Sequence, residues 1–188
     1  MAYFPAFFQM EGLRVLLVGG GSIAYEKLEK LLDFTEDISI MALEVSEEVS
    51  KLATQHNLSL EKRAYKHGDI DGFDVVVVAT DTVALHQEIY EETRGTRTFV
   101  NSVDNTEYCD FIFPSYVQKG DLTVAFSTGG ASPAFAKKMR QYFEKNIPDS
   151  VENFLAQLKK LRKTMPKGKS RMQYFEALVE GYFSKHFK

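Results

Sequence analysis

The sequence has few of the groups that cross-link a chain or anchor it. Its 188 residues include one cysteine, Cys109, which rules out an internal disulfide framework and suits a reducing cytosol. The four histidines are scattered and far from Cys109, which speaks against a zinc site. No apolar run approaches the ~20 residues that a membrane span needs, and no signal-peptide pattern precedes the first expected strand. We therefore expect a cytoplasmic protein with no membrane anchor and no bound metal.

The chain does contain enough apolar material for a folded core. Hydrophobic residues make up 44% of the sequence and aromatic residues 13%. A chain of this size buries roughly 70% of the surface that it exposes when unfolded. Length and composition therefore predict one domain with an appendage, or two small domains.

The net charge of −3 conceals an uneven distribution. Residues 1–136 hold 10 Lys or Arg against 21 Asp or Glu, whereas residues 137–188, the basic tail, hold 13 against 5. This asymmetry favours a boundary near residue 136. It also favours an anionic partner for the tail, such as a polycarboxylate ligand, nucleic acid or an acidic neighbouring subunit. A solvated helix face would carry the same charges, and the count alone favours that simpler interpretation.

The most informative stretch combines a strand, a glycine turn and a helical pattern. Residues 14–18 form an apolar run typical of a strand buried on both faces. Gly19 and Gly21 follow in the spacing Gly-x-Gly-x-x-Ala, with Ala24 in the third small position. The second glycine lets the backbone approach a pyrophosphate, and the helix N-terminus offers it unpaired N–H groups. Because strand and helix flank the turn as the motif requires, the stretch predicts nucleotide binding.

Alternating apolar runs and helical patterns follow. Strands are expected at 38–43, 58–64, 74–80 and 98–103, with helices at 46–56 and 82–94. This order predicts an α/β fold with a Rossmann-type doubly wound parallel sheet. The apolar residues 3–8 are expected to form a strand or an arm on the sheet edge.

The remaining residues break the alternation. A β-hairpin is expected from two strands at 111–117 and 122–127, followed by a helix that Ser132 caps and two further amphipathic helices. Phe111, Phe113 and Phe126 would make the hairpin an exposed apolar surface, which we interpret as a subunit interface. The hairpin with the first helix is then a dimerisation segment, and the last two helices form a small helical C-terminal region.

Several polar residues lie at the carboxyl ends of the expected strands, where open α/β sheets bind ligands. Glu44, twenty residues after Ala24, is placed to bind the adenosine ribose, and no arginine follows to hold a 2′-phosphate, which favours NAD over NADP. A charge at the start of the next helix is an equal alternative for Glu44. Thr80 and Asp81 end the most hydrophobic strand.

Two further groups each have two readings of equal weight. Asp104 follows strand 98–103 and is either a turn cap or a general base for an oxidation. The run 127–130 is either a cradle for a carboxylate or phosphate, or an ordinary capped turn.

Three ordered motifs decide between these alternatives. The run 101–115, the hairpin around 119–125 and the run 127–133 resemble the sirohaem synthase N-terminal family of precorrin-2 dehydrogenases, some of which are also sirohydrochlorin ferrochelatases. The opening, with Phe4-Pro5, the glycine loop and then Lys27, is similar too. The likeness spans about residues 3–147, and His86 departs from it by standing where the family commonly has asparagine.

The resemblance implies NAD-dependent oxidation of precorrin-2 to sirohydrochlorin by a homodimer. It implies an NAD-binding domain at 1–113, a dimerisation segment at 114–148 and a helical region at 149–188. Asp104 would be the general base. The implied cofactor contacts are Gly19, Gly21, Ser22, Ile23, Leu43, Glu44 and Thr80, with Asp81 beside them. The implied substrate contacts are Ser127, Thr128, Gly129, Gly130 and Ser132.

Two alternatives to this reading stay open. A bifunctional enzyme would also insert Fe²⁺ into sirohydrochlorin, with Asp104 taking the pyrrole protons. A redox sensor would bind NAD(H) without catalysing a reaction and would bind nucleic acid through its basic tail. The tail has no helix-turn-helix signature, so no nucleic-acid partner is expected.

Overall fold

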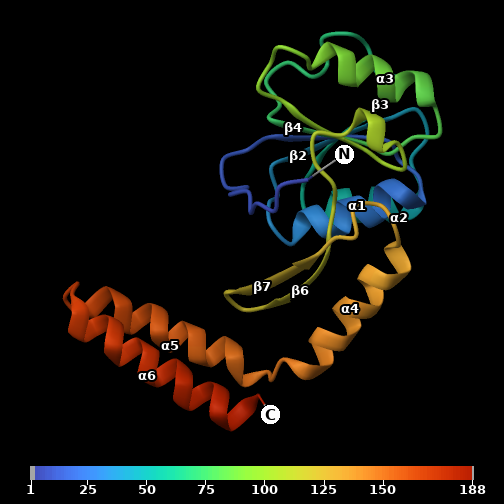
Figure 1. The fold of residues 1–188 in the computed structure, drawn as a ribbon. Helices are drawn as coiled ribbons and strands as arrows, with labels where there is room; N and C mark the ends of the chain where they lie inside the picture. Colours follow the sequence, from blue (N-terminus) through green and yellow to red (C-terminus); the bar gives the residue numbers. More distant parts are fainter. Residues whose placement is uncertain (1–2, 188) are drawn as a thin grey trace. The chain divides into compact units, whose positions relative to one another are not determined.

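The computed structural model describes residues 3–187, which form two compact units (Figure 1). The first unit ends at Phe113 and the second begins at Pro114. Helix α4 (Pro133–Asn146) passes residue 136 without interruption. The boundary near residue 136 that the charge asymmetry favours is therefore wrong, because charge on a helix surface does not break the helix.

The first unit is a five-stranded parallel sheet with helices on both faces. Its strands lie in the order β3-β2-β1-β4-β5, and all four neighbouring pairs are parallel. This arrangement confirms the predicted Rossmann-type sheet. In chain order its elements are β1 (Val15–Val18), α1 (Ser22–Leu32), β2 (Ile38–Ala42), α2 (Glu47–Gln55), β3 (Ser59–Lys62), β4 (Val75–Val78), α3 (Val83–Glu92), β5 (Phe99–Ser102) and the short 3₁₀ helix η1 (Thr106–Tyr108).

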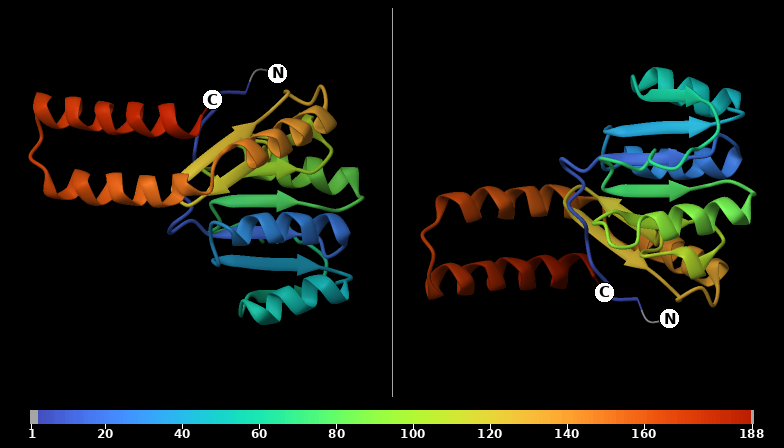
Figure 2. Two further views of the ribbon diagram at one scale, coloured as in Figure 1. Left: turned by 90° about the horizontal axis from the view of Figure 1, so that it is seen from below. Right: turned by 90° about the horizontal axis from the view of Figure 1, so that it is seen from above.

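Strands β1 and β4 are apolar at every position because both of their faces are covered. All four residues of β1 and all four of β4 are buried. Alternate side chains serve two separate cores: Leu17 faces α1 and α2, whereas Leu16 faces α3. Figure 2 shows the helices on the two sides of the sheet. The edge strand β3 is mostly exposed, as its alternating sequence predicts.

The chain reverses its winding direction between β1 and β4. From β1 it proceeds outward through β2 to β3, then returns to β4 on the other side of β1 and proceeds to β5. The loops after β1 and β4 therefore diverge at the carboxyl edge of the sheet. Open α/β sheets bind ligands at such a switch point.

Residues 3–8 form an arm and not a strand. Phe8 packs edge-on against Phe99 of β5, with ring centroids 5.4 Å apart, and lies 6.3 Å from the ring of Phe111. The expected arm on the sheet edge is confirmed.

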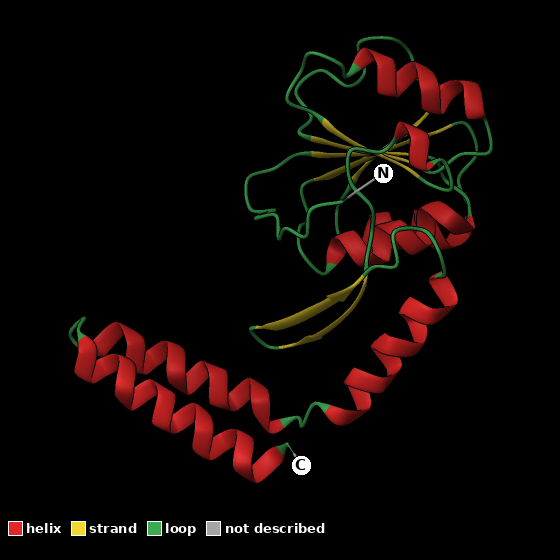
Figure 3. Ribbon diagram, viewed as in Figure 1, coloured by secondary structure: helices red, strands yellow, loops and turns green. Residues whose placement is uncertain are grey.

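Within the described residues, the second unit contains an antiparallel hairpin and three helices (Figure 3). Its elements are β6 (Ser115–Lys119), β7 (Leu122–Phe126), α4, α5 (Ser150–Thr164) and α6 (Lys169–His186). Its core is formed by Val117 of β6 with Ile147 and Val151. Helices α5 and α6 pack through the stacked rings of Phe154 and Tyr182, whose centroids lie 4.1 Å apart. Within residues 3–187 no helix has the length and apolar content to cross a membrane.

The expectation that three phenylalanines make the hairpin an exposed apolar surface is wrong. Phe111 and Phe113 precede the hairpin and pack half-buried against the core of the first unit. Phe126 packs on Phe143 of α4 at a centroid distance of 5.1 Å. An apolar run predicts burial but does not say which surface buries it. The subunit interface itself stays a prediction.

Asp110 ties the edge strand β5 to helix α3. Its carboxylate accepts the backbone N–H of Val100 at 2.9 Å and a two-pronged contact from Arg94 at 2.9 and 2.7 Å. The Arg94 guanidinium also lies 3.9 Å from the ring centroid of Tyr90. Burial raises the pKa of Asp110, but these hydrogen bonds outweigh it and hold the pKa below its ordinary value. Asp110 therefore fixes the chain as it leaves the site region.

We expect Asp110→Ala to lower the free energy of unfolding by about 2–4 kcal/mol, because it leaves a strand N–H and a guanidinium without their acceptor. Asp110→Asn keeps an acceptor oxygen and should lose less. Because the folded pKa is depressed, the carboxylate's contribution is complete above its unfolded pKa and disappears as pH falls through the folded pKa. Urea unfolding of the three proteins at several pH values measures this. Equal stabilities at neutral pH would contradict it.

Candidate functional site

The glycine loop is packed so tightly against two neighbouring turns that it has no room for side chains. Gly19 has φ +132°, and a Cβ at this position would overlap the carbonyl oxygen of Ala79 at the end of β4. A Cβ on Gly20 would overlap the carbonyl oxygen of Glu44 after β2. The Gly-x-Gly-x-x-Ala motif does not require glycine at position 20. The run of three glycines was the only sequence feature that pointed to close packing at Gly20. The loop thus joins the ends of β2 and β4.

The third glycine faces open space instead. Nothing lies within 4 Å of a Cβ built on Gly21, which is the N-cap of α1. This cap makes no side-chain hydrogen bond, and the first turn of α1 contains no acidic residue. By contrast, Ser46 caps α2 by accepting the Val49 N–H at 3.3 Å. The start of α1 therefore has backbone donors and space for a phosphate, so these residues fit a dinucleotide.

The loop after β2 lies beside the glycine loop. The backbone N–H of Ser46 donates to the Gly20 carbonyl oxygen at 2.8 Å, which holds the two turns together. Leu43 is 73% exposed, and Glu44 is exposed as well. An exposed leucine and a carboxylate offer an apolar surface for an adenine ring and an acceptor for ribose hydroxyls.

The turn after β5 brings Asp104 to the same edge of the sheet. The Val103 N–H donates to the Val78 carbonyl oxygen at 2.9 Å, so this turn lies next to the end of β4. Asp104 is exposed and has φ +62°, a left-handed conformation that is uncommon outside glycine. The structure therefore gathers Gly19, Gly21, Thr80 and Asp104 at one edge.

A buried histidine connects two of these turns. His86 of α3 has no exposed surface, and its Nε2 lies 2.9 Å from the Thr80 carbonyl oxygen. Its Nδ1 lies 3.5 Å from the side-chain nitrogen of Asn105. From the sequence, His86 was recognised only as a departure from the family pattern. No sequence motif links His86 with Asn105.

Lys27 is the cation near Asp104. Its ammonium lies 4.9 Å from the ring centroid of Phe113. Burial is the main cause that lowers the Lys27 pKa, with the charge of Lys30 acting in the same direction, while the charges of Glu26 and Asp104 partly oppose them. From the sequence, Lys27 was recognised only as part of the family resemblance. Its partial burial near Asp104 is seen only in the structure.

Cys109 has a structural role in the turn that follows Asp104. Its thiol is buried, donates to the Ser102 carbonyl oxygen at 3.1 Å and accepts the Ser102 N–H at 3.2 Å. Burial raises the pKa of this thiol, which keeps it protonated at neutral pH.

The run 127–132 lies in the second unit and is a capped turn. The Gly129 N–H donates to Ser127 Oγ at 3.1 Å, and the Ser132 N–H donates to Thr128 Oγ1 at 3.0 Å. Ser132 Oγ accepts the Phe135 N–H at 3.2 Å and caps α4, as predicted. Each hydroxyl accepts through its oxygen and so retains a proton that it can donate to an anion. Gly129 and Gly130 both have positive φ, at 60° and 89°.

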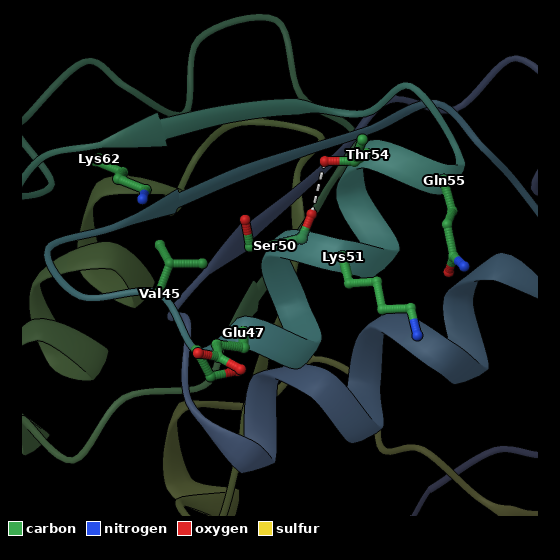
Figure 4. Close-up of a pocket in the computed structure, with 8 residues that line it drawn as sticks. Val45, Glu47, Ser50, Lys51, Thr54, Gln55 and Lys62 are labelled. Atoms are coloured by element: carbon green, nitrogen blue, oxygen red, sulfur yellow. Dashed lines mark hydrogen bonds between the residues drawn. The ribbon is translucent and has the colours of Figure 1, made fainter.

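A hollow of about 570 Å³ lies along α2 and the end of β3 (Figure 4). Its lining includes Ser50, Lys51 and Lys62, and Thr54 Oγ1 donates to the Ser50 carbonyl oxygen at 2.9 Å. None of the predicted site residues lines it, but Val45 and Ser46 do, so the hollow borders the loop after β2 that is bonded to the glycine loop. Among residues 3–187 no group of three or more His, Cys, Asp or Glu is placed to hold a metal ion.

The parallel sheet, its switch point and the glycine loop define a dinucleotide-binding protein of the Rossmann class. A family described as putative NAD(P)-binding matches residues 6–115, and one described as sirohaem biosynthesis protein central matches residues 119–146. The chain belongs to this NAD(P)-binding family and, within it, to the sirohaem synthase N-terminal family that its motifs indicate.

Named relatives agree with this assignment. Siroheme synthase of Methylococcus capsulatus is 32% identical over 185 residues, which cover 96% of this chain and 39% of that protein. Siroheme synthase of Pseudoalteromonas atlantica is 34% identical over 165 residues, covering 88% of this chain and 36% of that protein. The chain thus spans about two fifths of the length of these relatives. The solved structure of SirC, precorrin-2 dehydrogenase, superposes with a TM-score of 0.79 at 25% identity and covers 95% of this chain and 88% of that chain.

The glycine loop provides a matched pair of substitutions. Gly21→Ala should leave the free energy of unfolding within about 1 kcal/mol of the parent, because the new methyl group meets only open space. We expect it to weaken NAD⁺ binding about tenfold or more, or ~1.4 kcal/mol, because the methyl group occupies the approach of the pyrophosphate. Gly19→Ala should cost more than about 4 kcal/mol of stability through its overlap with a carbonyl and its strained φ. Urea unfolding and calorimetric titration with NAD⁺ measure both; unchanged NAD⁺ affinity in Gly21→Ala would contradict the assignment.

Lys27→Met should leave stability unchanged or raise it, because it removes an ammonium that burial disfavours, whereas turnover should fall. The lysine's folded pKa lies below the unfolded value, so the penalty for its charge is complete below the folded pKa and is relieved as pH rises toward 10.5. The stability difference between the two proteins should therefore shrink between neutral pH and about pH 10. Urea unfolding at the two pH values checks this, and a markedly less stable variant would contradict it.

Proposed function

We propose that this chain is an NAD-dependent dehydrogenase that oxidises precorrin-2 to sirohydrochlorin. The observation that carries the proposal is the common edge of the parallel sheet, where the glycine loop, Thr80 and Asp104 lie together. This edge combines a dinucleotide cradle with an exposed carboxylate. The similarity to a structure titled precorrin-2 dehydrogenase and to siroheme synthases supports the choice of substrate.

The loops after β1, β2 and β4 would hold the cofactor. Gly19 and Gly21 would let the backbone approach the pyrophosphate, and the N–H groups of Ser22 and Ile23, at the start of α1, would be its donors. Leu43 would pack on the adenine, and Glu44 would accept from the ribose hydroxyls, with Thr80 and Asp81 toward the nicotinamide. Bound NAD⁺ supplies the hydride acceptor.

Asp104 would act as the general base. Oxidation removes a hydride from one carbon of the substrate and a proton from another atom, and the hydride leaves on the cofactor. The carboxylate of Asp104 takes the proton and becomes a neutral acid that can release it to solvent. Its exposure allows both contact with the substrate and that release. The ammonium of Lys27 lies near this carboxylate, and the charge of Asp104 acts on it.

The second unit would contribute substrate binding and the dimer. Precorrin-2 carries eight carboxylates, and the hydroxyl and backbone donors of Ser127, Thr128, Gly129, Gly130 and Ser132 suit such groups. The basic tail would steer the polyanion, since exposed charge pairs contribute only ~0–1 kcal/mol each to binding. Residues 114–148 would form the interface of a homodimer.

The sharpest test replaces the base. We expect Asp104→Asn to slow NAD⁺ reduction on precorrin-2 by about 10²–10⁴-fold, because the amide cannot accept the proton. NAD⁺ binding should survive, since the substitution leaves the glycine loop intact. Stopped-flow or steady-state absorbance of NADH measures the first, and calorimetry the second.

Asp71→Asn provides the control, because Asp71 is an exposed carboxylate in the turn that precedes β4, away from the carboxyl edge. Its turnover should match that of the parent. Full activity in Asp104→Asn would remove Asp104 from the chemistry.

A further inference from the structure

His86 is a fully buried polar side chain that the proposed chemistry does not use. It lies in the first turns of α3, and each ring nitrogen has a partner from a different turn at the carboxyl edge. Nε2 lies 2.9 Å from the Thr80 carbonyl oxygen and 3.3 Å from the Thr80 hydroxyl. Nδ1 lies 3.5 Å from the side-chain nitrogen of Asn105. One imidazole therefore joins the end of β4 to the turn after β5.

The two partners determine where the ring proton lies. A carbonyl oxygen can only accept, so Nε2 carries the proton and donates to Thr80. The amide nitrogen of Asn105 can only donate, so Nδ1 is the acceptor. The same nitrogen of Asn105 also donates to the Val103 carbonyl oxygen at 3.2 Å. The ring thus has a single tautomer that serves both contacts.

These contacts brace the backbone around Asp104. The Asn105 side chain reaches back to Val103, and the Asn105 N–H donates to the Ser102 carbonyl oxygen at 3.2 Å, so both bonds span Asp104. Asp104 has φ +62°, a conformation that is unfavourable for a residue with a Cβ and persists only where neighbouring contacts hold it. The Asn105 amide is one such contact, and His86 is its partner on the buried side.

We infer that His86 is a positioning residue that couples the cofactor side of the site, at Thr80, to the carboxylate of Asp104. It acts through the Thr80 carbonyl on one side and through Asn105 on the other. Its kinetic consequences rest on the proposed function, whereas its hydrogen bonds can be tested without substrate. Reacting groups need a near-attack geometry, and a misplacement of about 1 Å can cost 10²-fold in rate.

Two amide substitutions separate the two contacts. In His86→Asn the amide lies where Nδ1 lies, so it can still accept from Asn105, but it is too short to reach Thr80. In His86→Gln the longer side chain can donate to Thr80 and leaves nothing for Asn105. We expect His86→Gln and Asn105→Ala to lower kcat about tenfold with the KM for NAD⁺ within about twofold. His86→Asn should instead raise the KM and the Kd for NAD⁺ about tenfold with a smaller effect on kcat.

Gln87→Ala is the matched control. Gln87 is the next residue of α3 and makes an exposed contact between this helix and η1, with its Oε1 3.5 Å from the Tyr108 hydroxyl. Its loss should leave kcat and KM within about twofold of the parent. Thermal unfolding of every variant establishes that the rates compare folded proteins.

A measurement independent of turnover completes the test. ¹⁵N NMR of the His86 ring should show a protonated Nε2 and an unprotonated Nδ1. The inference is overturned if the spectra show an Nδ1–H tautomer. It is also overturned if both amide variants lose kcat and NAD⁺ affinity equally, because a general packing role would give that result. If the parent protein fails to reduce NAD⁺ with precorrin-2, the proposed function fails, while the ring tautomer and the NAD⁺ affinities still decide the role of His86.

Discussion

The contact of backbone with backbone at the turn after β1 is the constraint on which the site depends. Gly19 and Gly20 lie so close to the carbonyl groups of Ala79 and Glu44 that neither position has space for a Cβ. This packing draws the ends of β2 and β4 together around β1, the central strand of the sheet. The switch point of the fold and the phosphate cradle are therefore one structure, held by the absence of side chains. Gly21, with its open Cβ direction, is the position left for a ligand.

The other turns at the carboxyl edge of the sheet are positioned by the strands and by polar contacts around the glycine loop. The apolar residues of β1 and β4 hold the sheet through two cores, and β5 aligns with β4 so that the turn bearing Asp104 lies beside the turn bearing Thr80. Polar contacts then set the details that apolar packing leaves free. Asp110 anchors β5, and His86 joins the two turns. Rigid strands bring the groups to one place, and hydrogen bonds orient them.

Much of this could be predicted from the sequence because its signals are local. Runs of valine and leucine predict buried parallel strands, and a glycine pattern directly after the first run predicts the turn and its ligand. Asp104 was identifiable because a residue that directly follows a parallel strand must lie at the binding edge. Ser132 was predicted as a cap from its position before Pro133, and the structure has it there.

The features that could not be predicted depend on contacts between distant residues. His86 and Asn105 are separated by nineteen residues, and neither belongs to a motif that implies the other. The burial of Lys27 depends on Phe113, which the sequence placed in the hairpin and the structure places on the first core. The boundary near residue 136 was wrong because net charge reports on solvent-facing side chains and carries no information on where a helix stops.

The central claim is that this edge performs a dehydrogenation, and the reaction itself tests it most directly. Purified protein should be mixed with NAD⁺ and precorrin-2 while the absorbances of NADH and of the tetrapyrrole are followed together. We expect NADH and sirohydrochlorin to appear in equal amounts, and the formation of both to depend on the protein. Folded protein that binds NAD⁺ yet forms neither product would contradict it.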